Sequence, residues 1–549
     1  MSAQTAAVLR RPIGPTTLAP TPSRPVAGTA RLTRHALRVD RITVTAWAVS
    51  VGLIAGLIGI TFERLYPTTA SRLGLQKLAD SPVLRVILGP LLAPTSTGGL
   101  VAWRMGSIMV IVLGLATTFT VVRRTRAEEQ HDRGMLVLAA PVGRAAPVTS
   151  ALAVAAVLDG AAATTIALAM LALGQPAGGA VLLGAVVGAS AWSLGCAAAV
   201  VAQVASTSKG ANGAAAALVA VAFLLRALGE LTAGWLLWVN PLAWVAKAAP
   251  FADARPWVVA LPIAAGAALG SVAAWGATVR EFGTGLIPAR PHPSRPVGAT
   301  PLALAWRLER VSVAVTIGAA ACYSVAIGSV VGLFNSFIKS SPQFEQFLVR
   351  LGGTHVLEDA FTTSMAIFGA IAISGWAVSM VLRLHAEEVR GRVTVLVAGA
   401  ATRDSVFGGF SATAIGSAVL GLLCFGAGLG VGRAAVDRHL GSFAKGLAAG
   451  AVTVPAALVL VAVAMLAVGA SARTAPLAWA GVVWCAIVAV IGSFLGVPRV
   501  VVDTSPFWHV PAQPLHGAWW VPCVLLLAVS ALIMAVALVG FRRRELGAA

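Results

Sequence analysis

Charged residues are scarce in this chain. Asp, Glu, Lys and Arg make up 11% of its 549 residues, whereas a typical soluble domain is about a quarter charged. Hydrophobic residues make up 58%, and the mean hydropathy is +0.87. So much apolar surface cannot be accommodated in water, which excludes an ordinary soluble fold for most of the chain.

Residue types that mark reactive or cofactor-holding sites are also sparse. The five cysteines all lie in apolar runs without metal-ligand spacing, which argues against disulfides and a metal centre. The eight histidines are scattered, so the polar cluster expected of a membrane-embedded lipid-modifying enzyme is missing. The phosphate-binding pattern G-x-x-x-x-G-K-[ST] does not occur. We therefore expect a chain that is not an enzyme and holds no cofactor or metal of its own.

Long apolar runs dominate what the sequence does contain. A helix needs about 20 apolar residues to cross the roughly 30 Å hydrocarbon core of a bilayer. Such runs occur about twelve times, which predicts an all-α polytopic membrane protein. They lie near residues 43–62, 102–122, 147–173, 179–204, 213–238, 257–279, 311–333, 361–382, 405–431, 447–470, 475–497 and 519–541.

Basic residues are divided unevenly between the loops. If the N-terminus is cytoplasmic, 26 of the 40 Lys and Arg fall in cytoplasmic segments and 12 in outside loops. Because cytoplasmic loops of membrane proteins are enriched in Lys and Arg, this places both termini in the cytoplasm. The net charge of +20 then reports orientation in the plasma membrane, and we expect no nucleic-acid partner.

Short charged landmarks recur in the same order in both halves of the chain. They are ALRVDR (36–41) with AWRLER (305–310), NPLAWV (240–245) with SPFWHV (505–510), and REFG (280–283) with RELG (544–547). Each half then holds six helices, and an even number gives both halves the same orientation, a parallel repeat. We predict a disordered tail (1–30), a first six-helix half (31–283), a Pro-rich linker (284–300) and a second six-helix half (301–549).

The most informative repeat is a charged segment after the second span of each half. RTRAEEQHDRGMLVLAAPVGR (124–144) returns without a gap as RLHAEEVRGRVTVLVAGAATR (383–403). Orientation alone would require the arginines but not the paired glutamates. A duplicated charged helix on one face suggests a docking surface for a twofold partner.

These landmarks resemble the ABC-2-type exporter permeases, in particular the actinobacterial tetronasin-resistance or polyketide-antibiotic exporter family. The resemblance implies a permease that moves antibiotic- or drug-like amphipathic molecules out of the cell. It also implies two copies of a separate ABC ATP-binding subunit, which would bind the ATP and Mg. Membrane lipid and a small hydrophobic or amphipathic substrate would be the other partners.

The same resemblance assigns roles to particular segments. Residues 124–138 and 383–397 would be coupling helices seated in the ATPase subunits, with Arg124, Glu128, Glu129, Arg133, Arg383, Glu387, Glu388 and Arg392. Residues 31–42 and 301–310 would be interfacial helices, with Arg38, Asp40, Arg41, Arg307, Glu309 and Arg310. Residues 240–256 and 498–518 would form an outer gate, with Asn240, Pro241, Ser505 and Pro506.

Few polar or bulky side chains lie inside the predicted spans. Buried ionisable groups in membranes are functional candidates. Asp159 either packs helices through Thr164 or Thr165 or marks the transport path, and Arg226 with Glu230 either neutralise one another or belong to the outer gate. Adaptable Met and aromatic side chains suit a hydrophobic substrate, and the candidates on the second and eighth spans are Met105, Met109, Phe119, Phe361, Met365, Phe368 and Trp376.

The alternative function is a proton-coupled secondary drug transporter, which can also have twelve helices in two parallel halves. Such a carrier usually needs buried acids for proton relay, and only Asp159 and Glu230 are available.

Overall fold

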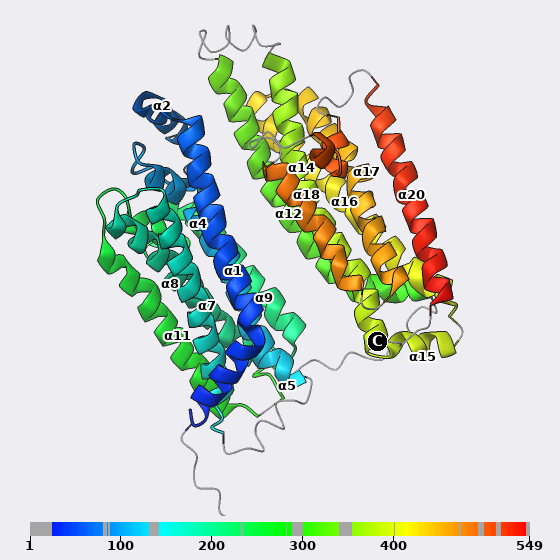
Figure 1. The fold of residues 1–549 in the computed structure, drawn as a ribbon, viewed down its shortest axis with the longest axis horizontal. Helices are drawn as coiled ribbons and strands as arrows, with labels where there is room; N and C mark the ends of the chain where they lie inside the picture. The colour runs from blue at the N-terminus through cyan, green and yellow to red at the C-terminus, as the bar shows by residue number, and fades with distance from the viewer. Residues whose placement is uncertain are drawn as a thin grey trace, which may run out of the picture. The chain divides into compact units, whose positions relative to one another are not determined.

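The computed structural model describes residues 25–80, 85, 88–130, 142–231, 234–281, 283–287, 300–339, 354–399, 401–471, 474–491, 499–511 and 518–544. The chain divides into two compact units, Met1–His292 and Pro293–Ala549. Most of the predicted tail and linker, and Arg133, lie outside the described residues. The described part of each unit is built of helices (Figure 1).

Eleven of the described helices are long and apolar enough to cross a membrane. This confirms the predicted fold class, an all-α polytopic membrane protein. The run predicted at 475–497 forms a short 3₁₀ turn and α18 (Ala478–Ile491), which is apolar but shorter than the others. Residues 492–498, which follow α18, lie outside the described part.

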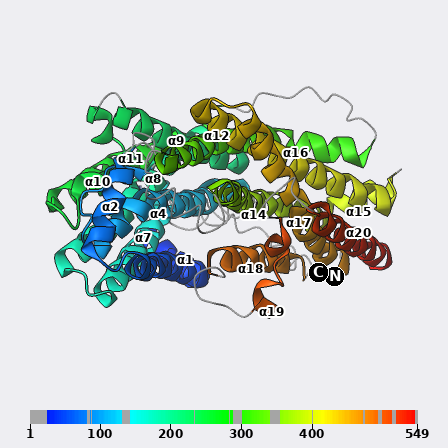
Figure 2. The same cartoon turned by 90° about the horizontal axis from the view of Figure 1, so that it is seen from above.

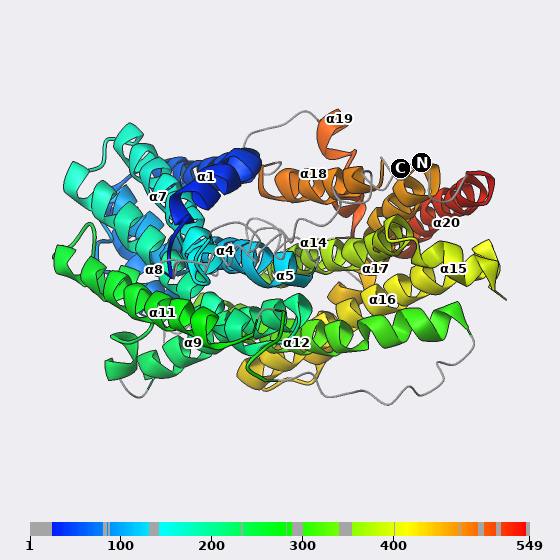
Figure 3. The same cartoon turned by 90° about the horizontal axis from the view of Figure 1, so that it is seen from below.

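The first unit is assembled around one central helix. Here α8 (Ala177–Val204) packs against α4 (Thr97–Val122), α7 (Ala146–Ala172) and α11 (Ala260–Val279), and α1 (Thr29–Leu65) packs on α7. Figures 2 and 3, which look along the helices, show these three around α8. The unit has one further spanning-length helix, α9 (Ser208–Leu231). Its shorter elements are α2 (Thr69–Ala79), η1 (Arg123–Ala127), α5 (Glu128–Gln130), η2 (Gly234–Leu237), α10 (Trp244–Ala248) and η3 (Pro256–Val259).

The second unit repeats this packing. Here α17 (Gly441–Ala470) packs against α14 (Thr354–Val389), α16 (Arg403–Asp437) and α20 (Trp520–Arg543), and α12 (Pro301–Lys339) packs on α16. The shorter elements are α15 (Arg392–Ala398), η4 (Ala475–Leu477), α18, α19 (Arg499–Val502) and η5 (Pro506–His509). Helices α1, α4, α7, α8 and α11 therefore correspond in packing to α12, α14, α16, α17 and α20.

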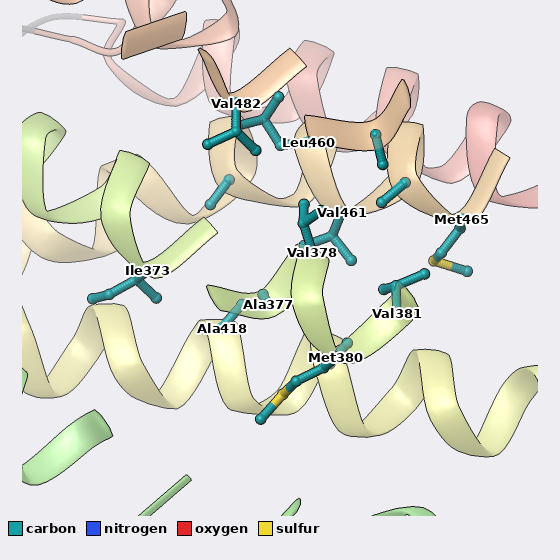
Figure 4. Packing of buried hydrophobic residues seen from close by; sticks show 14 of the residues in the cluster. Ile373, Ala377, Val378, Met380, Val381, Ala418, Leu460, Val461, Met465 and Val482 are labelled. Carbon is teal, nitrogen blue, oxygen red and sulfur yellow. The ribbon is translucent and has the colours of Figure 1, made fainter. Parts of the chain in front are cut away.

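Small residues let the helices of the second unit approach closely. A Cβ built on Gly446 of α17 would lie 2.4 Å from the Cα of Gly430 on α16, which is the close backbone approach that glycine permits between membrane helices. Further along the same helices the core is aliphatic. Figure 4 shows Val378, Ala418, Val461 and Met465 interlocked between α14, α16 and α17.

Two predicted helix boundaries are wrong. Residues 31–42 and 301–310 are not separate helices, because α1 and α12 run through them without a break. The predicted coupling segments also begin as continuations of the second and eighth spans, because no Gly or Pro interrupts them before Gly134 and Gly391. At Gly391, φ is 73°, a left-handed conformation that ends α14 before α15 begins.

Candidate functional site

The charged residues predicted to form docking helices lie at one end of each unit, where the second helix of that unit ends. We call this end, with the ion pairs below, the junction of the unit. In the first unit α4 leads through η1 into α5, at the end of the unit from which α1 starts (Figure 1). The turn η1 is π-helical, a local irregularity that often marks functional sites.

The first ion pair of this junction joins α1 to η1. Asp40 is buried, and its carboxylate contacts Arg123 Nη2 at 2.9 Å and Arg124 Nη2 at 2.5 Å. Arg124 also donates to the carbonyl of Ala36. An acid on the first helix is thus neutralised by two cations that follow the second span.

The second ion pair joins α5 to the end of α11. Glu129 accepts from Arg126 at 2.7 Å and forms a close pair with Arg280. Arg280 in turn donates to Gln203 of α8 at 2.6 Å. Both arginines also donate to the carbonyl of Thr284, each at 2.9 Å. The Glu129 carboxylate therefore links the segment after α4 to the ends of α8 and α11.

The second unit has equivalent pairs. Glu309 on α12 pairs with Arg383 on α14, as Asp40 pairs with Arg124. Glu388 accepts two hydrogen bonds from Arg544, at 2.7 and 2.6 Å, as Glu129 pairs with Arg280. Glu387 additionally accepts from Arg392 at 3.0 Å.

A third contact is also shared. Arg144 at the start of the third helix donates to the carbonyl of Arg280 at 2.8 Å, and Arg403 donates to the carbonyl of Arg544 at 3.0 Å. The two junctions thus repeat in geometry as well as in sequence. Sequence reasoning assigned no role to Arg280 or Arg544, although their landmarks REFG and RELG recur.

At two positions the second junction lacks an arginine that the first junction has. At the offset of 259 that aligns the charged segments, Leu382 replaces Arg123 and His385 replaces Arg126. α14 passes through these positions as a regular helix, without a π-helical turn. The second unit instead has an exposed bidentate pair between Arg542 and Asp404, with both bonds 2.8 Å. The two junctions are therefore unequal in charge and in backbone geometry.

The predicted docking carboxylates mostly face their own unit. Side chains of Glu129, Glu387 and Glu388 are 9%, 10% and 2% exposed, whereas Glu128 is partly exposed. The surface around the second junction presents the exposed Arg392 and Val395 of α15 instead, with Val395 73% exposed. A contact with another protein at this junction would therefore involve surface residues such as Arg392 and Val395. The buried carboxylates would stabilise the helices that carry this surface.

Asp159 is a buried acid in the membrane-spanning core of the first unit. Thr117 of α4 donates to its Oδ1 at 2.7 Å, and Asp159 is 2% exposed. The expected partners were wrong: Thr164 donates to the carbonyl of Gly160, and Thr165 to that of Ala48. The two hydroxyls are thus satisfied by backbone carbonyls of α7 and α1. Among the described residues, Thr117 of α4 supplies the side-chain donor to the Asp159 carboxylate.

The predicted outer-gate residues lie at the end of the first unit opposite its junction. Asn240 donates to the carbonyl of Ala222 at 2.7 Å and accepts from the amide of Leu242, so it fastens the segment after α9 back onto that helix. Pro241 follows it and is half-buried.

Arg226 and Glu230 lie one turn apart on α9 beside a left-handed glycine, Gly89 (φ 92°). A Cβ at Gly89 would lie 2.8 Å from Arg226 Nη2 and 3.9 Å from Glu230 Oε1. Both side chains therefore reach the loop that precedes α4. In the second unit Ser505 is buried just before η5, which begins at Pro506.

The residues proposed for a substrate path differ in burial within their own units. Met109 is a core residue, with Met105 packed partly buried against the same cluster. Phe119 and Phe368 are 43% and 45% exposed. Met365 and Trp376 are partly buried against the core of the second unit, and the side chain of Phe361 lies outside the described residues.

Among the residues that the structure describes, no group of three or more His, Cys, Asp or Glu could hold a metal ion. The five cysteines are all free thiols. What distinguishes the molecule is a set of repeated, intramolecular ion pairs at the ends of membrane-length helices. The fold and these junctions define a polytopic α-helical membrane protein with an internal repeat.

Comparison with known proteins identifies the family. Residues 299–542 match the family described as "Multidrug efflux system permease Rv1217c, C-terminal domain". Over 525 residues the chain is 32% identical to the multidrug efflux system permease protein Rv1217c of Mycobacterium tuberculosis strain H37Rv, covering 94% of this chain and 95% of that relative. The chain belongs to this family of efflux permeases.

Proposed function

We propose that the chain is the membrane-spanning permease of an ATP-driven exporter that removes drug-like amphipathic molecules from the cell. The relationship to a multidrug efflux permease over almost the whole chain carries this proposal. The resemblance to ABC-2-type antibiotic exporters supplies its finer parts: an antibiotic- or drug-like amphipathic molecule as substrate, and an ATPase on a separate subunit.

The two junctions support a twofold ATPase partner. Each places a repeated set of ion pairs at one end of its unit, and we assign that end to the cytoplasm because basic residues concentrate there. Two copies of the ATPase subunit would each contact one junction. Because Leu382 and His385 replace two arginines in the second junction, the two contacts would differ in strength.

The partner is tested by purifying the tagged chain from its own host in mild detergent and identifying co-purifying proteins by mass spectrometry. The buried glutamates are poor probes, since their loss would disturb the fold as well as a docking surface. Val395→Glu is a sharper change because this side chain lies on the surface of α15. Val500→Glu, on the 80% exposed valine of α19, is the matched control far along the chain from the charged segment.

We expect a stoichiometric P-loop ATPase to co-purify with the unaltered chain and the control, and to be lost with Val395→Glu while the chain stays monodisperse. Drug uptake into everted vesicles should then require ATP and be blocked by vanadate. Uptake that ignores vanadate but collapses with a protonophore would favour the proton-coupled carrier, and Asp159→Asn should then abolish it.

A further inference from the structure

The first turns of α1 carry a stripe of exposed arginines. Arg31, Arg34, Arg38 and Arg41 are all exposed, and their spacings of three, four and three residues place them on one face of the helix. We call these four residues the arginine stripe.

The acid on these turns does not neutralise the arginine stripe. Asp40 lies on the opposite face, is 3% exposed, and is engaged by Arg123 and Arg124. The helix therefore directs its negative charge into the unit and its positive charges outward. His35, between the arginines, is also exposed.

The same helical face continues into side chains suited to hydrocarbon. Beyond Arg41 it presents Ile42, Val49, Leu53 and Ile60, which are 75%, 43%, 67% and 40% exposed. These residues follow the arginine stripe at helical spacing, and α1 is unbroken over 37 residues. An exposed aliphatic face on a spanning helix of the first unit is where acyl chains pack.

The length of α1 places the arginines at the head-group level. At about 1.5 Å per residue a 37-residue helix is about 55 Å long, whereas the hydrocarbon core is about 30 Å thick and the head-group regions extend this to about 40–45 Å. The residues from Ile42 to Phe62 match the core thickness. The turns from Arg31 to Arg41 therefore lie in and just beyond the head groups of one leaflet.

We propose that the arginine stripe is a binding site for the head groups of anionic phospholipids, occupied from the bilayer that surrounds the first unit. Clustered basic residues next to a spanning helix attract anionic lipids electrostatically. Guanidinium groups also bind phosphate oxygens in a bidentate manner. Continuity with the lipid-facing stripe below is what favours lipid over an acidic protein partner.

The second unit keeps only half of this feature. Arg307 and Arg310 correspond to Arg38 and Arg41 at the offset of 269, and both are exposed, whereas Thr300 and Ala303 stand where the first unit has Arg31 and Arg34. We therefore expect the first unit to prefer anionic lipid more strongly than the second unit, because Arg31 and Arg34 have no counterpart there.

The test uses the full chain, purified and delipidated in detergent, and native mass spectrometry with equimolar phosphatidylglycerol and phosphatidylcholine of identical acyl chains. The variant is Arg31→Gln/Arg34→Gln. The control is Arg64→Gln/Arg255→Gln, which removes two exposed arginines from the opposite end of the same unit. Monodispersity by size exclusion checks that each variant is folded.

We expect the unaltered chain to prefer phosphatidylglycerol and the stripe variant to lose about fivefold in affinity per arginine, or roughly 25-fold for the pair. The control should keep the preference. An unchanged preference in the stripe variant, or an equal loss in the control, would overturn the proposal. Loss of a co-purifying protein with lipid preference intact would assign the stripe to a protein partner instead.

Discussion

The buried pair of Glu388 and Arg544 offers a direct test of how the second junction is held together. The two hydrogen bonds are 2.7 and 2.6 Å, and the side chains are 2% and 10% exposed. The guanidinium also lies 4.8 Å over the ring of Phe541. Removing one partner of a buried pair leaves a charge without compensation, which costs about 3–5 kcal/mol. Glu388→Ala should lower the free energy of unfolding by about that amount.

The chain provides a control of the same chemistry in a different environment. Asp404 and Arg542 form a bidentate pair with two bonds of 2.8 Å, but their side chains are 46% and 53% exposed. Exposed pairs contribute little because water solvates the separated charges. Asp404→Ala should therefore leave the free energy of unfolding unchanged within error.

The assay is reversible unfolding of the purified chain in mixed micelles by increasing SDS, followed by tryptophan fluorescence. A double change, Glu388→Met/Arg544→Met, should recover most of the stability lost in Glu388→Ala, because apolar replacement of both partners removes the unpaired charge. Equal destabilisation by Glu388→Ala and Asp404→Ala would refute the argument from burial. A double variant as unstable as the single one would show that the contact matters through shape and not through charge.

Three further changes test separate parts of the fold. Thr117→Val removes the hydrogen-bond donor to Asp159. Because the buried carboxyl is then left without a partner, the free energy of unfolding should fall by about 1–3 kcal/mol in the same SDS titration. No change would mean that another donor reaches the carboxylate. Gly184→Ala would place a Cβ 2.2 Å from a carbonyl oxygen of α7 and should reduce the yield of monodisperse protein. The Cβ of the control, Gly160→Ala, would meet nothing within 4 Å, so its yield should be unchanged. Similar yields of the two variants would contradict tight packing of α7 on α8. Arg438 is exposed and ends α16 in a left-handed conformation (φ 52°). Because glycine adopts that conformation without strain, Arg438→Gly should raise the free energy of unfolding by up to about 1 kcal/mol, and with it the melting temperature. A lower melting temperature would show that the side chain contributes more than the strain costs.

The inequality of the junctions has a consequence for transport. In the first junction Arg126 and Arg280 both engage Glu129, whereas in the second Glu388 has its bidentate bond to Arg544 and His385 in place of the other arginine. Fewer cations pair with Glu388 than with Glu129. We therefore expect the ion pairs of the second junction to separate first when the helices move. Disulfide or spin-label distance measurements across each junction would show which one changes more with nucleotide.

Much of this architecture is determined by the sequence alone. Continuous apolar runs of this length specify membrane-length helices, because a helix satisfies all backbone hydrogen bonds within its own segment. Recurring landmarks such as LRVDR with WRLER and REFG with RELG located the charged ends of both units. They did so because the same charges are needed wherever the same packing is repeated.

Only the tertiary structure decided what those charges bind. Glu129 and Arg280 are 151 residues apart, and Glu388 and Arg544 are 156 apart, so no local spacing rule could pair them. From the sequence the glutamates were expected to face a partner, because a duplicated charged helix suggested a docking surface. Packing of the final helix of each unit against the central one brings a cation to each carboxylate, and that long-range contact turns it inward.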